Sequence, residues 1–308
     1  MTQRRGRGGK MIRKGHKKRV WAVASSPSGA RLASVDMGGV LCVGPMWQAQ
    51  PQHIIQAHSS YATAVCWLDE VHVVAAGIDG AGVWEAETGS KLDEVVYPER
   101  TVIQHAVTWG ERVVLSGQSD QGWSWLPGVG IERGSSRPGS RLASTPGGLL
   151  AYHDEAGDVV VLDASGEEVW RMNPGGFVHS VALSPDGSCV AVGGWITQGK
   201  GEGTHVWVHD LPSGALRRIH SGFSSSIDTL EFSEDGALLA AGPGSGSLQV
   251  WRLEDGKSMS EAFDGLPVAM DASLADGTLV LAESMKSKVR LYDLHKFLGR
   301  GPCHGIGA

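Results

Sequence analysis

The chain has 308 residues, of which 44 are Gly, 41% are hydrophobic and 19% are charged. A chain of this length and apolar content can bury a large core, which excludes a wholly disordered protein. No stretch approaches the 18 or more consecutive apolar residues of a membrane-spanning helix, and no Gly-X-Y period indicates a collagen. The excess of Gly predicts many tight turns between short strands.

The formal net charge of −6 conceals a basic arm on an acidic body. The first 19 residues hold nine of the 27 bases and no acid, so the remainder carries 18 bases against 33 acids. Arg4, Arg5 and Arg7 stand among glycines in residues 1–9 and, with Lys10, form a candidate contact for RNA, DNA or an acidic partner. A solubilising tail is the alternative. Since the body is negative, a nucleic-acid contact would be confined to the arm.

A cytoplasmic location is expected from the start of the chain and from its cysteines. The basic residues are not followed by an apolar segment, because Met11 and Ile12 lead directly to Arg13 and Lys14, so no secretory signal is expected. The four cysteines lie far apart and form no CxxC pair. Free, buried thiols in a reducing compartment are the interpretation that this spacing favours.

The dominant feature along the chain is a unit of about 40 residues that recurs. Each unit begins with a short apolar strand and a tight turn, continues with a strand that ends in small residues, and adds a third strand that often ends in an aromatic residue. Period-2 patterning and Gly-marked turns favour antiparallel meanders over helices. Four strands per unit predict the blades of a β-propeller. The predicted first strands begin near residues 20, 62, 103, 139, 178, 226 and 267.

The last unit predicts how the ring closes. It supplies three strands, at 267–273, 278–283 and 288–294, before a Gly-rich tail at 299–308. The segment 10–14 is the candidate for the missing outermost strand, because pairing the two ends removes an exposed sheet edge. An exposed arm is the alternative. The expected organisation is therefore an arm over 1–9, an all-β seven-bladed propeller over 10–298, and the tail.

The turns at 183–187 and 232–236 and the Tyr292-Asp293 pair resemble the WD40-repeat family. The resemblance implies a structural network of His, Ser, Asp and Trp in each blade. Here the network is degenerate: the first blade lacks the Trp, the second has Ala in place of Ser, and the later blades lack the His. The residues that fit the repeat are His16, Ser34, Asp36, His58, Asp79, Trp84, Trp125, Asp163, Trp207, Asp210, Trp251, Tyr292 and Asp293.

A search for catalytic patterns finds none that fits the predicted strands. GxSxG, HExxH, the phosphate-binding GxxxxGK[ST] and a strand-linked GxGxxG are all missing from the sequence, and the twelve His residues show no metal-ligand spacing. We therefore expect no cofactor, no metal and no catalysis. A propeller hydrolase with a metal in its central channel is an alternative.

The expected function is a non-catalytic WD40-type scaffold or recognition subunit that binds proteins in a larger assembly, with neither a membrane nor a small-molecule substrate. The longest unit contains an insertion at 195–203, where Trp195 and Ile196 begin a Gly-rich loop. This loop either contacts a partner or folds back on its own blade. Trp47 is a second candidate, on the opposite face. Candidates on the same rim as Trp195 are His58, Tyr61, Arg100, Arg137, Phe177 and Phe223.

Overall fold

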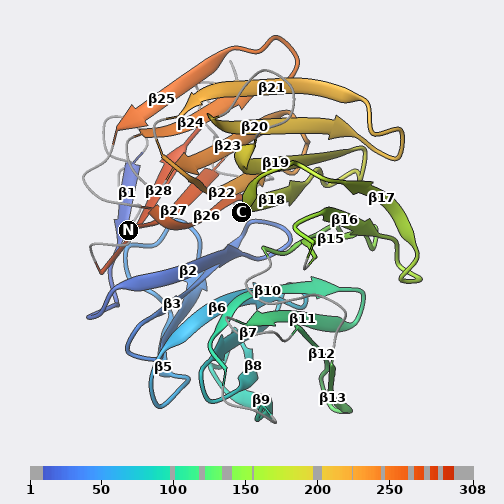
Figure 1. Ribbon diagram of the computed structural model, residues 1–308. Helices are drawn as coiled ribbons and strands as arrows, with labels where there is room; N and C mark the ends of the chain where they lie inside the picture. Colours follow the sequence, from blue (N-terminus) through green and yellow to red (C-terminus); the bar gives the residue numbers. More distant parts are fainter. Residues whose placement is uncertain are drawn as a thin grey trace.

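The computed structural model is a ring of seven antiparallel β-sheets, each of four strands (Figure 1). The predicted all-β, seven-bladed propeller is therefore confirmed. Within the described ranges there is no helix, and hence none that could cross a membrane. The ranges that the structure describes are 10–97, 101–117, 122–133, 141–154, 156–196, 203–223, 225–243, 247–262, 267–273, 278–283 and 287–294.

The first three blades are meanders in which strands that follow one another in sequence are neighbours in the sheet. Blade 1 consists of β2 (Val20–Ser25), β3 (Arg31–Asp36), β4 (Val40–Pro45) and β5 (His53–Gln56). Blade 2 consists of β6 (Ala62–Trp67), β7 (His72–Gly77), β8 (Ala81–Glu85) and β9 (Lys91–Val95). Blade 3 consists of β10 (Ile103–Trp109), β11 (Arg112–Gly117), β12 (Gly122–Leu126) and β13 (Gly130–Arg133).

The next three blades repeat the pattern. In blade 4 the first strand begins at Ala143 rather than near 139, and residues 134–140 lie outside the described ranges. Blade 4 consists of β14 (Ala143–Ser144), β15 (Leu150–His153), β16 (Val159–Leu162) and β17 (Glu168–Met172). Blade 5 consists of β18 (Phe177–Leu183), β19 (Cys189–Ile196), β20 (Gly203–Asp210) and β21 (Leu216–Phe223). Blade 6 consists of β22 (Ile227–Phe232), β23 (Leu238–Pro243), β24 (Ser247–Arg252) and β25 (Ser258–Ala262).

The last blade joins the two ends of the described chain. It consists of β26 (Pro267–Ser273), β27 (Thr278–Glu283), β28 (Lys288–Asp293) and β1 (Lys10–Arg13). The N-terminal strand β1 is antiparallel to β28 and pairs Lys10 with Tyr292 and Arg13 with Val289. Figure 1 shows the blue β1 beside the red-orange β28. The predicted closure by residues 10–14 is therefore confirmed, with Lys10 in the closing strand.

The first strand of every blade contacts the first strands of the two neighbouring blades, so these seven strands surround the central axis. We call the face at which first strands begin and second strands end the upper face. In six first strands one residue near the upper end is unpaired and shifts the register, which is a β-bulge. These bulge residues are Trp21, Thr63, Gln104, His179, Asp228 and Val268.

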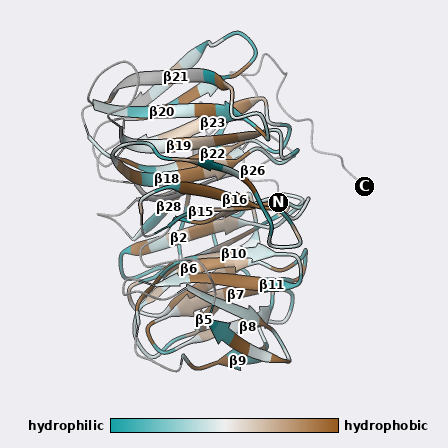
Figure 2. Ribbon diagram, turned by 45° about the vertical axis from the view of Figure 1, so that its right-hand side comes forward, coloured by the Kyte–Doolittle hydropathy of each residue, from teal (hydrophilic) through white to brown (hydrophobic). Residues whose placement is uncertain are grey.

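The core lies between blades rather than within one blade. One buried cluster joins Val35 and Val43 of blade 1 to Val65 and Trp84 of blade 2, and similar clusters follow around the ring. Figure 2 shows the hydrophobic colouring along strands such as β11 and β16. Burial of a large apolar side chain contributes about 1.5–3 kcal/mol. Apolar packing between neighbouring blades is therefore the main source of cohesion.

Candidate functional site

The upper end of blade 1 contains a fully buried polar network. The loop before β2 carries His16, whose Nδ1 donates to Asp36 Oδ2 at 2.9 Å and whose Nε2 accepts from Ser34 Oγ at 2.7 Å. Asp36 also accepts from the backbone N–H groups of Gly38 and Val40. Burial alone would raise the pKa of Asp36, but these hydrogen bonds outweigh it and lower the pKa. The predicted first-blade set therefore forms a satisfied structural network.

The strand register shows which side chain occupies the place of the missing Trp in blade 1. Gly44 pairs with the second residue of β3, as Trp84 pairs with the second residue of β7. The space above Gly44 holds the side chain of Arg13, which is 1% exposed and donates to the Pro45 carbonyl at 3.2 Å. Burial lowers the pKa of Arg13 to about 10. The closing strand therefore packs a guanidinium where the second blade has an indole.

Blade 2 has a related network that is more open. His58 Nδ1 donates to Asp79 Oδ1 at 2.6 Å, and Ser59 donates to the other oxygen through its N–H and its hydroxyl. His58 Nε2 faces the Ala75 carbonyl at 3.2 Å, because Ala75 has no hydroxyl to offer. The ring thus lies between two acceptors, whereas His16 lies between an acceptor and a hydroxyl. His58 is 7% exposed and the side chain of Asp79 is 39% exposed.

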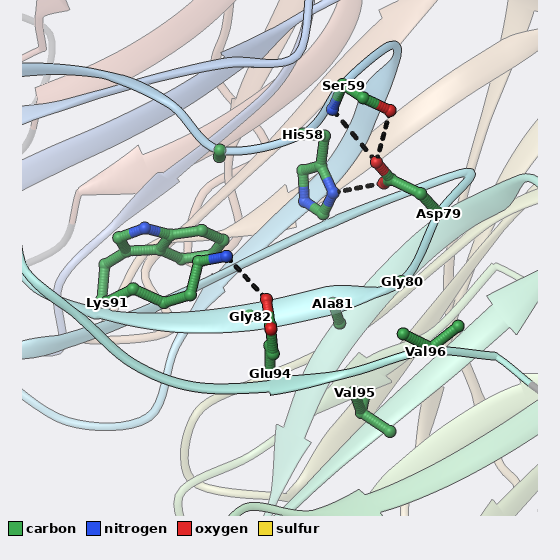
Figure 3. Close-up of a pocket in the computed structure, with 12 residues that line it drawn as sticks. His58, Ser59, Asp79, Gly80, Ala81, Gly82, Lys91, Glu94, Val95 and Val96 are labelled. Carbon is green, nitrogen blue, oxygen red and sulfur yellow. Dashed lines mark hydrogen bonds and ion pairs between the residues drawn. The ribbon is translucent and has the colours of Figure 1, made fainter.

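A cavity of about 320 Å³ opens beside this second network. Figure 3 shows His58 and Asp79 on one side and the pair formed by Lys91 and Glu94 on the other. Lys91 Nζ is 2.6 Å from Glu94 and 5.7 Å from the centre of the Trp84 ring. Small residues at 80–82 leave the hollow open. The polar groups in the wall are engaged with one another, which makes this hollow part of the blade 2 network.

The upper end of blade 5 carries a row of residues in direct register across its four strands. Phe177 of β18 pairs with Trp195 of β19, Trp195 pairs with Thr204 of β20, and Thr204 pairs with Phe223 of β21. Residues paired in this way present their side chains on one face of a sheet. Phe177 is 75% exposed and Trp195 is 45% exposed. We call Phe177, Trp195, Thr204 and Phe223 the blade 5 row.

The blade 5 row is packed against blade 6 at its Phe223 end and exposed to solvent at its Phe177 end. Phe223 stacks edge-on against Trp251 of blade 6, with 5.8 Å between ring centres. Below Trp195, a Cβ added to Gly194 would lie 2.0 Å from the Phe177 carbonyl oxygen. The close approach of β18 and β19 at this point therefore requires glycine. Trp195 lies within β19 and not on the predicted loop, which is a correction to the sequence-based interpretation.

The other rim candidates are distributed unevenly. Tyr61 is 41% exposed at the upper end of blade 2, whereas His58 is held inside the network described above. Trp47 follows β4 on the lower face and packs partly against a cluster that contains Val20 and Val289. Ile196 ends β19. The candidates outside the described residues are Arg4, Arg5, Arg7, Arg100 and Arg137.

Most of the remaining repeat residues lie in the third strands. Trp125, Trp207, Trp251 and Tyr292 are all less than 9% exposed. Asp163 accepts from the N–H and hydroxyl of Ser165 and closes a turn. Asp210 ends β20 and Asp293 ends β28. Among the described residues, no group of three or more His, Cys, Asp or Glu side chains could hold a metal ion.

Sequence reasoning missed one polar cluster, at the mouth of the central channel on the upper face. Arg141 precedes β14 and contacts His105 of β10, with 2.7 Å between the two nitrogens. The charges of His153 of β15 and Asp228 of β22 act on this pair, and His179 of β18 acts on His153. The signal in the sequence was a polar residue near the start of several first strands. Its meaning depends on ring geometry, which a single unit of the repeat does not reveal.

Three comparisons place the chain among known proteins. The family model described as "WD domain, G-beta repeat" matches residues 9–43 and 214–252. The small ribosomal subunit protein RACK1z of Oryza sativa subsp. japonica is 32% identical over 132 residues, which cover 40% of this chain and 36% of that protein. The match thus spans little more than a third of that relative.

One solved structure is similar to this chain over almost its whole length. The Cps50 (Swd1) β-propeller domain of Myceliophteria thermophila matches with a TM-score of 0.75 and 14% identity, over 91% of this chain and 97% of that chain. At this level of identity the likeness concerns the fold alone. The two chains therefore share the propeller architecture.

Proposed function

We propose, from the premise that this chain is a WD40-repeat β-propeller, that it acts as a non-catalytic scaffold that recognises a protein partner in a larger assembly. Protein binding is the coarse function that the family match and the two similar proteins support. The particular partner surface is our own inference from the described side chains.

The observation that carries the proposal is the exposed aromatic end of the blade 5 row. Phe177 and Trp195 face each other across two strands and leave much of their surface in water. Large aromatic side chains are enriched in the residues that dominate binding energy at protein interfaces. Their position is rigid, because β19 is paired on both sides through Trp195. A rigid exposed aromatic pair loses little conformational entropy on binding, which favours affinity.

The contrast with the polar rim supports the same surface. His16, His58 and their carboxylates are engaged in hydrogen bonds within their own blades. They hold the loops in place and have few donors left for a partner. The blade 5 row is apolar and has no such internal role at its Phe177 end. A partner that presents an apolar patch would therefore bind blade 5 rather than blades 1 and 2.

The similar proteins support membership in an assembly. The rice relative is named as a small ribosomal subunit protein, which makes that protein a component of a multi-subunit particle. We extend the general role, and not that particular particle, to this chain. We also infer a cytoplasmic location, supported by the free and buried state of Cys42, Cys66 and Cys189.

The proposal is tested by comparative capture from an extract of the native source. The wild-type chain and the double variant Phe177→Ala/Trp195→Ala are immobilised and the captured proteins are quantified. Loss of the contact should cost about 2 kcal/mol or more, or roughly a 30-fold loss of affinity, in at least one specific partner. Leu216→Ala is the matched control, because Leu216 is 48% exposed at the lower end of the same blade. Equal capture by all three proteins would contradict the proposal.

A further inference from the structure

The mouth of the central channel contains an arginine held by a neutral histidine. Arg141 Nη1 donates to His105 Nε2 at 2.7 Å. Burial, followed by the charge of Arg141, holds the pKa of His105 well below its usual value. His105 therefore accepts with its Nε2 lone pair and carries its proton on Nδ1. The charge of Arg141 is positioned by this contact without being neutralised by it.

The charged groups that act on Arg141 come from both sides of the channel. His105 belongs to blade 3, whereas Asp228, whose carboxylate influences the pKa of Arg141, belongs to blade 6. Blades 4 and 5 separate these two blades around the ring, and both groups stand on first strands, which surround the central axis. Asp228 Oδ1 accepts from Ser226 Oγ at 2.6 Å. Among the described residues, no carboxylate lies within 4.0 Å of Arg141.

Two further histidines complete the rim of the mouth. His179 is the bulge residue of β18, and His153 ends β15. Burial lowers the pKa of His153, the charges of Arg141 and His179 lower it further, and the carboxylate of Asp154 opposes them. The segment that carries Arg141 brings no acid, since no Asp or Glu occurs between residues 133 and 153.

We propose that this mouth is an oxyanion site that binds a carboxylate, with Arg141 as the main ligand and His105, His153 and His179 around it. A guanidinium has five N–H donors in a planar fork that matches a carboxylate, and one of them is used by His105. The pairing is strong here because the groups are removed from bulk water. Asp228 opposes the anion and sets an upper limit on affinity.

The carboxylate can come from two sources with the same chemistry. It is either a free small carboxylate or the side chain of an Asp or Glu in a segment bound at the upper face. The site is independent of the proposed use of the blade 5 row, because no residue of that row contributes to it. Variants of Phe177 and Trp195 therefore serve as controls that should keep the anion site intact.

The test follows the histidine side-chain NMR signals of the labelled full-length protein during titration with acetate. The signals of His105 and His179 should move in the wild type, and Arg141→Gln should weaken binding about tenfold or more. Asp228→Asn should tighten binding severalfold, because it removes a repelling charge. The matched control Arg112→Gln, at an exposed ion pair with Glu132 of the same blade 3, should leave the response unchanged.

Two results would contradict the proposed anion site. One is that the histidine signals of the wild type do not respond to acetate, and the other is that the Arg141→Gln protein responds as the wild type does. The wild-type titration stands on its own if a variant does not fold, and Arg141→Lys provides a milder second variant. A Glu-containing peptide and its Gln counterpart then identify the source. If the Glu peptide displaces acetate and the Gln peptide does not, the site binds a docked side chain. If neither peptide displaces acetate, the site binds a free carboxylate.

Discussion

The upper ends of blades 1 and 5 differ in what they present to water. In blade 1 the side chains of His16 and Asp36 are 2% and 0% exposed and bind each other. In blade 5 Phe177 and Trp195 are 75% and 45% exposed. Of these two blades, blade 1 has the structural network of the repeat and a buried rim, whereas blade 5 lacks the network and has an apolar, exposed rim. Loss of the network therefore frees a position for recognition.

Strand length explains how blade 5 differs. The second strand of blade 1 has 6 residues and ends at Asp36, which pairs with Val20. The second strand of blade 5 has 8 residues, and its Gly194 pairs with Val178 just below Trp195. The two blades therefore have the same bulged start, but β19 continues beyond it. The extra strand length raises an aromatic pair above the position at which blade 1 ends in a carboxylate.

The largest expected effect is loss of the blade 1 network. Asp36→Ala leaves His16 Nδ1 and the backbone N–H groups of Gly38 and Val40 without their acceptor in a dry site, and should lower the free energy of unfolding by about 3–5 kcal/mol. Asp79→Ala should cost only about 1 kcal/mol, because the side chain of Asp79 is 39% exposed. Denaturant unfolding of both variants measures the difference. Equal losses would break the distinction between a buried and an open rim.

A second change alters Gly194, which lies next to Trp195 in β19 and holds β18 and β19 close together. The Cβ in Gly194→Ala would lie 2.0 Å from the Phe177 carbonyl oxygen, so β18 must move away. We expect a loss of about 1–3 kcal/mol in unfolding free energy, together with weaker partner capture. Gly110→Ala is the control: its Cβ would have no atom within 4 Å and the residue has φ +60°. It should cost about 1 kcal/mol and leave capture unchanged. Impaired capture by Gly110→Ala would contradict the assignment of partner capture to the close approach of β18 and β19.

The smallest expected effect is a pH dependence that belongs to blade 1. Hydrogen bonds hold the pKa of Asp36 below its ordinary value in the folded state, despite burial. Its contribution is therefore complete above about pH 4 and is lost as the pH falls through the folded-state pKa. The slope should approach at most about 1.4 kcal/mol per pH unit. The stability gap between wild type and Asp36→Asn should thus narrow in acid, and a constant gap would contradict the assignment.

The sequence predicted what is local and repeated. Turn residues at fixed offsets locate the strands that begin at Val20 and Ala62, and the missing strand of the last unit identifies Lys10–Arg13 as the closure. The first-blade set His16, Ser34 and Asp36 follows from the family pattern and is found in contact. The strand positions and the first-blade set depend on neighbours within about 40 residues of one another, whereas the closure joins the two ends of the described chain and was predicted because the last unit lacks one of its four strands.

Two of the features that escaped prediction depend on the ring. Arg13 fills the place of an indole only because the two ends of the described chain meet beside Gly44. Arg141, just before blade 4, contacts His105 of blade 3 and is influenced by the charge of Asp228 in blade 6. Trp195 was predicted on a loop because Gly-rich sequence follows it, whereas pairing with Phe177 and Thr204 extends the strand. The first two features join residues of different repeat units, whereas the pairing of Trp195 lies within blade 5 and was hidden by the Gly-rich sequence that follows it.

The most direct test of the central claim is site-specific photo-crosslinking from the upper end of blade 5. A photoreactive phenylalanine analogue is placed at Trp195, and in a separate protein at Leu216, at the lower end of the same blade. Both proteins are irradiated in an extract of the native source and the crosslinked products are identified by mass spectrometry. Recognition through the blade 5 row predicts a defined crosslinked partner from position 195 and none from position 216. The same partner from both positions, or from position 216 alone, would contradict the account.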